Sequence, residues 1–302
     1  MSERVFRVGT RGSKLALVQA NFVADWLRTA SGHKVEIQII STEGDETQGS
    51  LMNPMRPGVF VSSIRDALLA EKVDLIVHSF KDLPSAPIEG LQLVAVPERE
   101  DNRDVIVSNG NLGLMQLPAG SRVGTSSPRR EARINFLRPD LVTLPIRGNV
   151  DTRIQKLRDG QYDAIVLAAA GINRLGRQSE ISEYLNSEQL LPAPAQGALA
   201  IEIRTDDDQL RELLTPLNDA QTRLITTAER AVLVGINAAC TTAIGALAEL
   251  NGDQLTVTAE LSDPETNTHK RVRKTVGPVE VGMTSEAFQL GMYVARQLMS
   301  DD

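Results

Sequence analysis

The chain has 302 residues, of which 41% are apolar and 24% charged, a composition typical of a folded globular protein and not of a disordered one. Its net charge of −7 and its 3% of aromatic residues argue against nucleic-acid binding, which needs basic surfaces and stacking rings. The single cysteine, Cys240, excludes an internal disulfide and a Cys-based zinc cluster, and we expect no metal site. The sequence shows neither a membrane span nor a signal peptide, so we expect a cytoplasmic protein.

Strands alternate with helices over the first two thirds of the chain. Ser13 is expected to cap the first helix, whose apolar face would consist of Leu15, Val18, Phe22, Trp26 and Leu27. The expected strands are Phe6–Gly9, Val35–Ile40, Asp74–His78, Arg122–Gly124, Leu141–Ile146 and Asp163–Leu167. Further helices are expected at Val59–Ala70, Pro128–Leu137 and Val150–Arg158. This alternation favours α/β architecture, with parallel sheets covered by helices.

Two short patterns occur twice, in the same order. Arg7-Val8-Gly9-Thr10 recurs as Arg122-Val123-Gly124-Thr125, and Asp74-Leu75-Ile76-Val77 is matched by Asp163-Ala164-Ile165-Val166. The repetition indicates two similar α/β lobes with a ligand cleft between them. The segment Ala198–Arg204 is expected to return as a strand to the first lobe.

The pattern changes after about residue 219, where strands are grouped instead of alternating with helices. A helix at Thr222–Val234 precedes the expected strands Ala243–Glu249, Leu255–Leu261 and His269–Val276, and a last helix follows at Thr284–Met299. This order is typical of a smaller α+β domain. We therefore predict three domains: residues 1–97 with 198–216, residues 103–192, and residues 219–302.

The basic residues are concentrated in one region. The chain has 25 Arg and 7 Lys, and residues 122–177 hold ten Arg and one Lys against five acidic residues, a local charge of +6. Arginine grips carboxylates and phosphates with two parallel hydrogen bonds, so this segment predicts a specific anion site in an acidic protein.

Several residues in turns are candidates for chemistry. Ser127 and Pro128 suit a helix start, but Arg129 and Arg130 in the first turn oppose the helix dipole, which is unusual outside an anion site. The alternative is a solvated helix start. Asp82 follows a predicted buried strand and suits a general acid or base, but without other context an Asp–Lys pair that shapes the turn before Pro84 is the favoured explanation. Cys240, taken alone, fits an inert buried thiol.

Taken together, the segments resemble the porphobilinogen deaminase (hydroxymethylbilane synthase) family over nearly the whole chain. The resemblance rests on Thr10-Arg11-Gly12-Ser13, His78-Ser79-Phe80-Lys81-Asp82-Leu83-Pro84, Glu98-Arg99-Glu100-Asp101, Val123-Gly124-Thr125-Ser126-Ser127, Arg129-Arg130, Arg147-Gly148-Asn149-Val150-Asp151-Thr152-Arg153 and Pro194-Ala195-Gln196-Gly197. It implies two lobes like those of type II periplasmic binding proteins, followed by a smaller C-terminal α+β domain. It also implies a monomeric transferase that condenses four porphobilinogen molecules into hydroxymethylbilane, with release of ammonia, in tetrapyrrole (porphyrin and heme) biosynthesis.

The resemblance further implies a site and a cofactor. A dipyrromethane would be attached through a thioether to Cys240, and Asp82 would assist ammonia loss and stabilise the cationic azafulvene. The residues implied to bind the cofactor are Cys240, Lys81, Ser127, Arg129 and Arg130. Those implied to bind substrate carboxylates, or to contact the substrate nearby, are Arg11, Ser13, Thr125, Arg147, Arg153, Arg174 and Gln196. The partner is the small molecule porphobilinogen, with no nucleic acid and no membrane.

The chain departs from the family pattern at three places. Met55-Arg56-Pro57-Gly58 replaces a glycine-rich run with a lysine, Ala238-Ala239 replaces two glycines before Cys240, and Pro128 replaces an aliphatic residue. The first two departures motivate an alternative function, a two-lobed polycarboxylate-binding protein that has lost catalysis.

Overall fold

The computed structural model describes residues 4–40, 59–238, 242–263 and 268–300. The chain divides into two compact units, residues 1–99 with 198–223 and residues 100–197 with 224–302. The three-domain boundaries given above stay a prediction. Among the described residues, none of the helices combines the length and apolar character that a membrane span requires.

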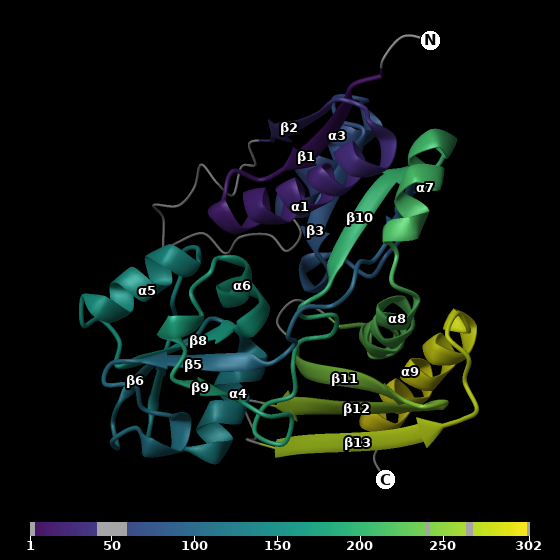
Figure 1. Cartoon of the computed structure of the whole chain (residues 1–302). Helices are drawn as coiled ribbons and strands as arrows, with labels where there is room; N and C mark the ends of the chain where they lie inside the picture. Colours follow the sequence, from purple (N-terminus) through teal and green to yellow (C-terminus); the bar gives the residue numbers. More distant parts are fainter. Residues whose placement is uncertain (1–3, 41–58, 239–241, 264–267, 301–302) are drawn as a thin grey trace. The chain divides into compact units, whose positions relative to one another are not determined.

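The first unit contains a five-stranded sheet with the order β2-β1-β3-β10-β4 (Figure 1). Its strands are β1 (Phe6–Thr10), β2 (Val35–Ile39), β3 (Leu75–Ser79), β4 (Leu91–Ala95) and β10 (Leu199–Arg204). β1 pairs in parallel with β2 and β3, whereas β10 runs antiparallel to β3 and β4. A 3₁₀ turn, η1 (Phe80–Asp82), follows β3 directly.

Helices cover both faces of this sheet. α1 (Lys14–Ser31) and α7 (Asp208–Leu214) bury apolar side chains against one face, and α3 (Val59–Leu69) packs on the other. A second 3₁₀ turn, η4 (Thr215–Leu217), follows α7. Because both faces are covered, β3 reads as a nearly continuous apolar run, as parallel strands usually do.

The buried face of α1 differs from the predicted one. Val18 and Phe22 are 36% and 50% exposed, and the buried residues of the helix are Gln19, Ala20, Val23, Ala24 and Leu27. Of the predicted face, Leu27 is buried as expected and Trp26 packs partly buried against the core, whereas Val18 and Phe22 point outward and Ala20, Val23 and Ala24 take their place. Sequence periodicity identifies a stripe of large apolar residues and cannot reveal this rotation.

The second unit repeats the architecture of the first. Its mixed sheet has the order β7-β6-β8-β5-β9, with β6 parallel to β7 and β8 and with β5 antiparallel to β8 and β9. The strands are β5 (Asp104–Ser108), β6 (Arg122–Gly124), β7 (Val142–Leu144), β8 (Ala164–Ala168) and β9 (Glu183–Tyr184). The helices and 3₁₀ turns are η2 (Leu114–Gln116), α4 (Pro128–Leu137), α5 (Val150–Arg158), α6 (Ala169–Arg174) and η3 (Gln178–Glu180).

The same arginine–aspartate pair joins the corresponding strands in both sheets. In the first sheet, the Arg7 backbone N–H and guanidinium donate to the Asp74 carboxylate at 2.8–3.0 Å. In the second, Arg122 makes the same three contacts to Asp163 at 2.7–3.1 Å. The repeated sequence patterns are therefore repeated structures.

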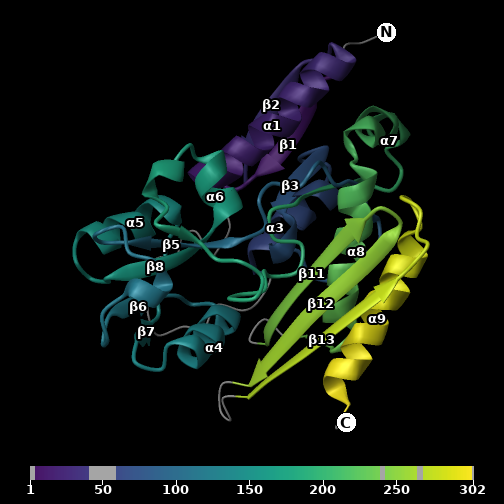
Figure 2. The same cartoon turned by 60° about the horizontal axis from the view of Figure 1, so that its bottom comes forward.

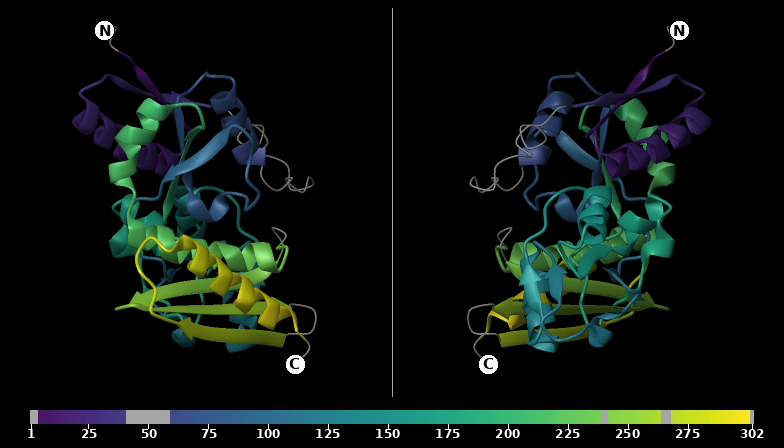
Figure 3. Two further views of the ribbon diagram at one scale, coloured as in Figure 1. Left: turned by 90° about the vertical axis from the view of Figure 1, so that its right-hand side faces the viewer. Right: turned by 90° about the vertical axis from the view of Figure 1, so that its left-hand side faces the viewer.

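A three-stranded antiparallel sheet completes the second unit. Its strands are β11 (Ala243–Asn251), β12 (Gln254–Asp263) and β13 (Thr268–Val276). α8 (Ala220–Gly235) and α9 (Thr284–Met299) bury apolar side chains against one face of it (Figures 2 and 3). Two lobes of type II topology and a C-terminal α+β region confirm the predicted fold class.

Candidate active site

In the second unit, arginine-bearing segments follow three neighbouring parallel strands. Residues 125–130 follow β6, residues 145–153 follow β7, and residues 169–174 form α6 directly after β8. The carboxyl ends of parallel strands meet at one edge of a sheet, which is where open α/β sheets bind ligands. The predicted residues of this unit are therefore brought to one edge.

The start of α4 is built as predicted from its sequence. The Ser127 hydroxyl accepts a hydrogen bond from the Arg130 backbone N–H (3.5 Å), and Pro128 takes the first helical position. Thr125, which is 2% exposed, accepts a hydrogen bond from the Ser127 N–H (3.2 Å). These contacts fix the direction in which the first turn presents Arg129 and Arg130.

Arg129 and Arg130 converge on one carboxylate, that of Asp104 at the start of β5. Arg129 Nη1 donates to Asp104 Oδ2 (2.7 Å), while Arg130 Nε and Nη2 donate to Asp104 Oδ1 (3.0 and 2.6 Å). Each arginine also donates to a backbone carbonyl, Arg129 to Leu191 (2.5 Å) and Arg130 to Val166 (3.0 Å). Both arginines are 7% exposed and Asp104 is fully buried.

Burial lowers the pKa of the Arg129 guanidinium. The charge and hydrogen bond of Asp104 and the charge of Glu260 counter this effect in part, and the neighbouring charge of Arg130 adds to it. An anion placed beside this buried guanidinium would be stabilised.

Gln196 reaches the same carboxylate from the segment before β10. Its amide donates to Asp104 Oδ1 (3.1 Å) and to the Asn102 carbonyl (2.8 Å), and the residue is fully buried. Ala195 before it has a left-handed backbone (φ 61°), and its N–H donates to the buried Glu229 carboxylate of α8 (2.6 Å). In this structure Gln196 therefore contacts the arginine pair through Asp104.

Arg153 and Arg174 differ from the arginine pair because no acidic residue within the described ranges lies in ion-pair distance of them. Arg153 Nε donates to the Gly148 carbonyl (2.8 Å) and Arg174 Nη2 to the Gly197 carbonyl (2.7 Å). Burial lowers the pKa of both, and the charge of Arg130 lowers that of Arg153 further. Arg147 is exposed on the segment after β7.

In the first unit, the predicted residues follow β1 and β3, which are parallel neighbours. The Ser13 hydroxyl caps α1 by accepting from the Ala16 N–H (3.3 Å), and Arg11 lies between β1 and this cap. Lys81, which is half-buried, and Asp82, which is exposed, belong to η1 after β3. No described side chain bonds to the Asp82 carboxylate.

Two further polar contacts, which sequence analysis did not predict, stabilise the end of β3. Gln19 of α1, 4% exposed, donates to the Ser79 hydroxyl (3.0 Å). His78 Nε2 lies 3.2 Å from Glu202 Oε2 of β10, and Glu202 also accepts two hydrogen bonds from Arg65 of α3 (2.8 and 2.6 Å).

Sequence analysis also missed Asp104. Its only signal is its position, since it is an acidic residue at the start of the apolar run Val105-Ile106-Val107. A carboxylate in such a run needs a buried cationic partner. Cys240, Ala239 and the segment around Pro57 lie outside the described residues.

The fold and the strand-end arginines define a class of protein, the two-lobed α/β proteins with lobes of type II topology, here with cationic residues at a ligand-binding edge. The family comparisons narrow this class. Residues 6–212 match the model "Porphobilinogen deaminase, dipyromethane cofactor binding domain", and residues 224–300 match "Porphobilinogen deaminase, C-terminal domain". The chain belongs to the porphobilinogen deaminase family.

Individual relatives agree with this assignment. "Porphobilinogen deaminase 1" of Streptomyces coelicolor is 49% identical over 85% of this chain and 82% of its own length. The "Porphobilinogen deaminase" of Syntrophobacter fumaroxidans is 42% identical over 99% of this chain and 96% of its own. A solved structure, the Bordetella pertussis BvgS periplasmic VFT2 domain, has 15% identity and a TM-score of 0.41, over 70% of this chain and 85% of that one. A similarity at that level carries no functional information.

Proposed function

We propose that the chain is a hydroxymethylbilane synthase, a transferase that condenses four porphobilinogen molecules head to tail and releases ammonia at each condensation, in tetrapyrrole biosynthesis. The observation that carries this proposal is the set of half-buried or buried arginines at the strand ends. Two of them, Arg153 and Arg174, have lowered pKa values and no acidic partner at ion-pair distance in the described chain. Such charges favour a ligand that brings several carboxylates.

The substrate supplies those carboxylates. Each porphobilinogen carries an acetate and a propionate, so every added pyrrole brings two negative charges. A forked guanidinium binds a carboxylate through two parallel hydrogen bonds, and lysine provides only a point charge. We propose that substrate carboxylates are bound by Arg11, Arg147, Arg153 and Arg174, with Ser13, Thr125 and Gln196 contributing nearby.

The dipyrromethane cofactor fits the residues at the start of α4. Arg129 is a buried guanidinium whose pKa is lowered by burial, so a nearby anion would stabilise its charge, and Ser127 stands at a helix N-terminus, where the helix dipole also stabilises an anion. We propose that Ser127, Arg129, Arg130 and Lys81 hold the cofactor's carboxylates and that the Cys240 thiol attaches it by a thioether. When bound, it supplies a covalently held pyrrole end to which the first substrate unit is joined.

Asp82 is proposed as the catalytic residue. Loss of ammonia from the aminomethyl group of porphobilinogen leaves a cation conjugated with the pyrrole ring. The Asp82 carboxylate is exposed, and no described side chain bonds to it, so it is available to accept a pyrrole N–H hydrogen bond and to face that charge.

Intact-mass measurement tests the cofactor assignment. The wild-type protein is expected to carry an added mass equal to a dipyrromethane, and the Cys240→Ser variant is expected to lack it. An unmodified wild-type protein would instead favour the two-lobed binding protein without catalysis. For catalysis, Asp82→Ala is expected to abolish ammonia release. The control Asp163→Asn, directly before β8 in the second unit, is expected to keep it. Ammonia release by Asp82→Ala at a near-normal rate would remove Asp82 from this role.

We further propose that the protein is a monomer of the cytoplasm that binds neither nucleic acid nor membranes. The net charge of −7 supports the absence of nucleic-acid binding. Light scattering coupled to gel filtration tests the oligomeric state, because a dimer would double the measured mass.

A further inference from the structure

Arg129 and Arg130 share a single buried counter-charge. Both arginine side chains are 8% exposed, and the Asp104 side chain between them is 0% exposed. The Leu191 and Val166 carbonyls and the Gln196 amide, which are neutral, also bond to these groups, and the charge of Glu260 acts on Arg129 as well. Two guanidinium groups are therefore held against one carboxylate in a site with little access to water.

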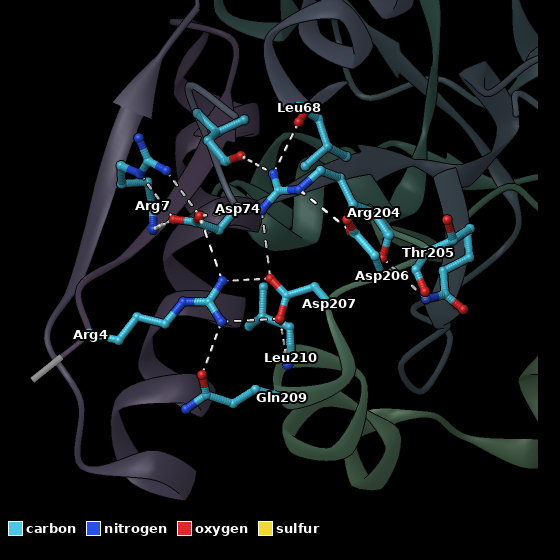
Figure 4. A network of polar contacts seen from close by, with 12 residues as sticks. Arg4, Arg7, Leu68, Asp74, Arg204, Thr205, Asp206, Asp207, Gln209 and Leu210 are labelled. Carbon is cyan, nitrogen blue, oxygen red and sulfur yellow. Dashed lines mark hydrogen bonds and ion pairs between the residues drawn. The ribbon is translucent and has the colours of Figure 1, made fainter. Parts of the chain in front are cut away.

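A second arginine–aspartate network is more exposed. Around Asp74 and Asp207, Arg4 and Arg7 are 32% and 38% exposed and Arg204 is 14% exposed, so water reaches the charges of Arg4 and Arg7 (Figure 4). At Asp104 both arginines and the carboxylate are buried. Buried ion clusters seldom stabilise a protein more than apolar side chains of the same volume would, which argues that stability alone does not explain this arrangement.

We propose that Asp104 is a positioning residue for the cofactor: it holds Arg129 and Arg130 in one orientation, so that the pair presents a fixed guanidinium surface to the cofactor carboxylates. The proposal rests on the proposed function. Each carboxylate oxygen takes a different arginine, and the Gln196 amide prevents the carboxylate from rotating by donating to the oxygen that binds Arg130. Asp104 itself is fully buried, so its proposed role is exerted through the two arginines.

A role of Asp104 through its charge and a role through orienting the arginines predict opposite effects of Asp104→Asn on anion binding. This substitution removes one negative charge from the cluster, so electrostatics alone predicts tighter binding of anions. If Asp104 acts by orientation, the two arginines repel each other, separate, and bind anions more weakly. Asp104→Glu keeps the charge and moves the carboxylate by one methylene group, so it alters position alone.

The experiment measures cofactor occupancy by intact mass, the KM and kcat for porphobilinogen, and the unfolding midpoint. Asp104→Asn is expected to lower occupancy and to reduce kcat/KM by roughly a hundredfold, the scale of a misplacement of about 1 Å. Asp104→Glu is expected to fold with a near wild-type midpoint and to show a smaller loss in the same direction. Asp163→Asn, which breaks the Arg122 pair in the same sheet, is the control and should leave occupancy and KM within about twofold, as expected for a partly exposed pair.

Three outcomes overturn the proposal. Asp104→Glu could show the cofactor occupancy and kcat/KM of the wild type, Asp104→Asn could show a lowered KM, or the Asp163→Asn control could lose as much occupancy and kcat/KM as Asp104→Asn. The Asp104→Glu variant keeps the test decisive if Asp104→Asn fails to fold. A wild-type protein with neither added mass nor ammonia release would refute the proposed function itself, and this result is distinct from all three.

Discussion

Glu202→Gln is expected to lower the stability of the first unit by an amount that disappears in acid. Glu202 lies on β10, 5% exposed, and accepts two hydrogen bonds from Arg65. Burial alone would raise its pKa, but hydrogen bonds from His78 and Arg65 outweigh burial and lower the pKa to about 2. Because His78 lies in the strand β3 that leads into Lys81 and Asp82, this cluster also supports the turn that carries the proposed catalytic residue.

The magnitude follows from the shift in pKa. The ordinary value is 4.5, so the change to about 2 corresponds to about 3 kcal/mol of stability at neutral pH, at about 1.4 kcal/mol for each unit. The substitution also leaves the Arg65 charge without its carboxylate partner. Breaking a buried ion pair in this way typically costs about 3–5 kcal/mol, so the expected loss rises toward that range. A lowered carboxyl pKa stabilises the fold fully above 4.5, and this stabilisation is lost as the pH falls toward 2.

Urea unfolding at a series of pH values, followed by tryptophan fluorescence, measures this difference. Trp26 is the only tryptophan and belongs to α1, so its emission reports on the unit that contains Glu202. The matched control is Glu36→Gln on β2, whose side chain is 51% exposed and pairs with Lys34. It should change stability by less than about 1 kcal/mol. A Glu202→Gln loss as small as the control, or one that persists unchanged at low pH, would refute the reasoning.

Two other predictions concern the second unit. A Cβ at Gly245 of β11 would lie 2.8 Å from Leu191 Cβ and 2.9 Å from its carbonyl oxygen, which binds Arg129. Gly245→Ala should therefore lower cofactor occupancy, whereas Gly252→Ala, strained by its φ of 62° but in open space, should lower only the unfolding midpoint. Arg153→Gln should raise the KM for porphobilinogen by roughly tenfold or more, the scale of a lost charge-assisted contact. Because burial disfavours the charge of Arg153, the midpoint should stay or rise, and a fall would assign Arg153 a structural role.

The repeated patterns show how far sequence reasoning reaches in this chain. The repeated four-residue patterns predicted two similar lobes, and the structure adds that Arg7–Asp74 and Arg122–Asp163 make the same three hydrogen bonds, a contact that the patterns did not predict. Local rules also predicted the caps at Ser13 and Ser127, because a cap depends on a few adjacent residues. The buried face of α1 was wrong, because the packing of Ala20 and Ala24 on the sheet decides which side of the helix is covered.

The sequence by itself determined the fold class, the family and the surplus of arginine in the second lobe, because these depend on local periodicity and on motifs read in order. The tertiary structure decided how the charges are compensated. Asp104 is 25 residues from Arg129, and Glu202 is 137 from Arg65, so no pattern along the chain pairs them. Only the folded sheet brings one buried carboxylate between two arginines while leaving Arg153 without an acidic partner at ion-pair distance in the described chain. This difference between the arginines matters because they are removed from water. A charged group in water needs no ion-pair partner, whereas a buried charged group does.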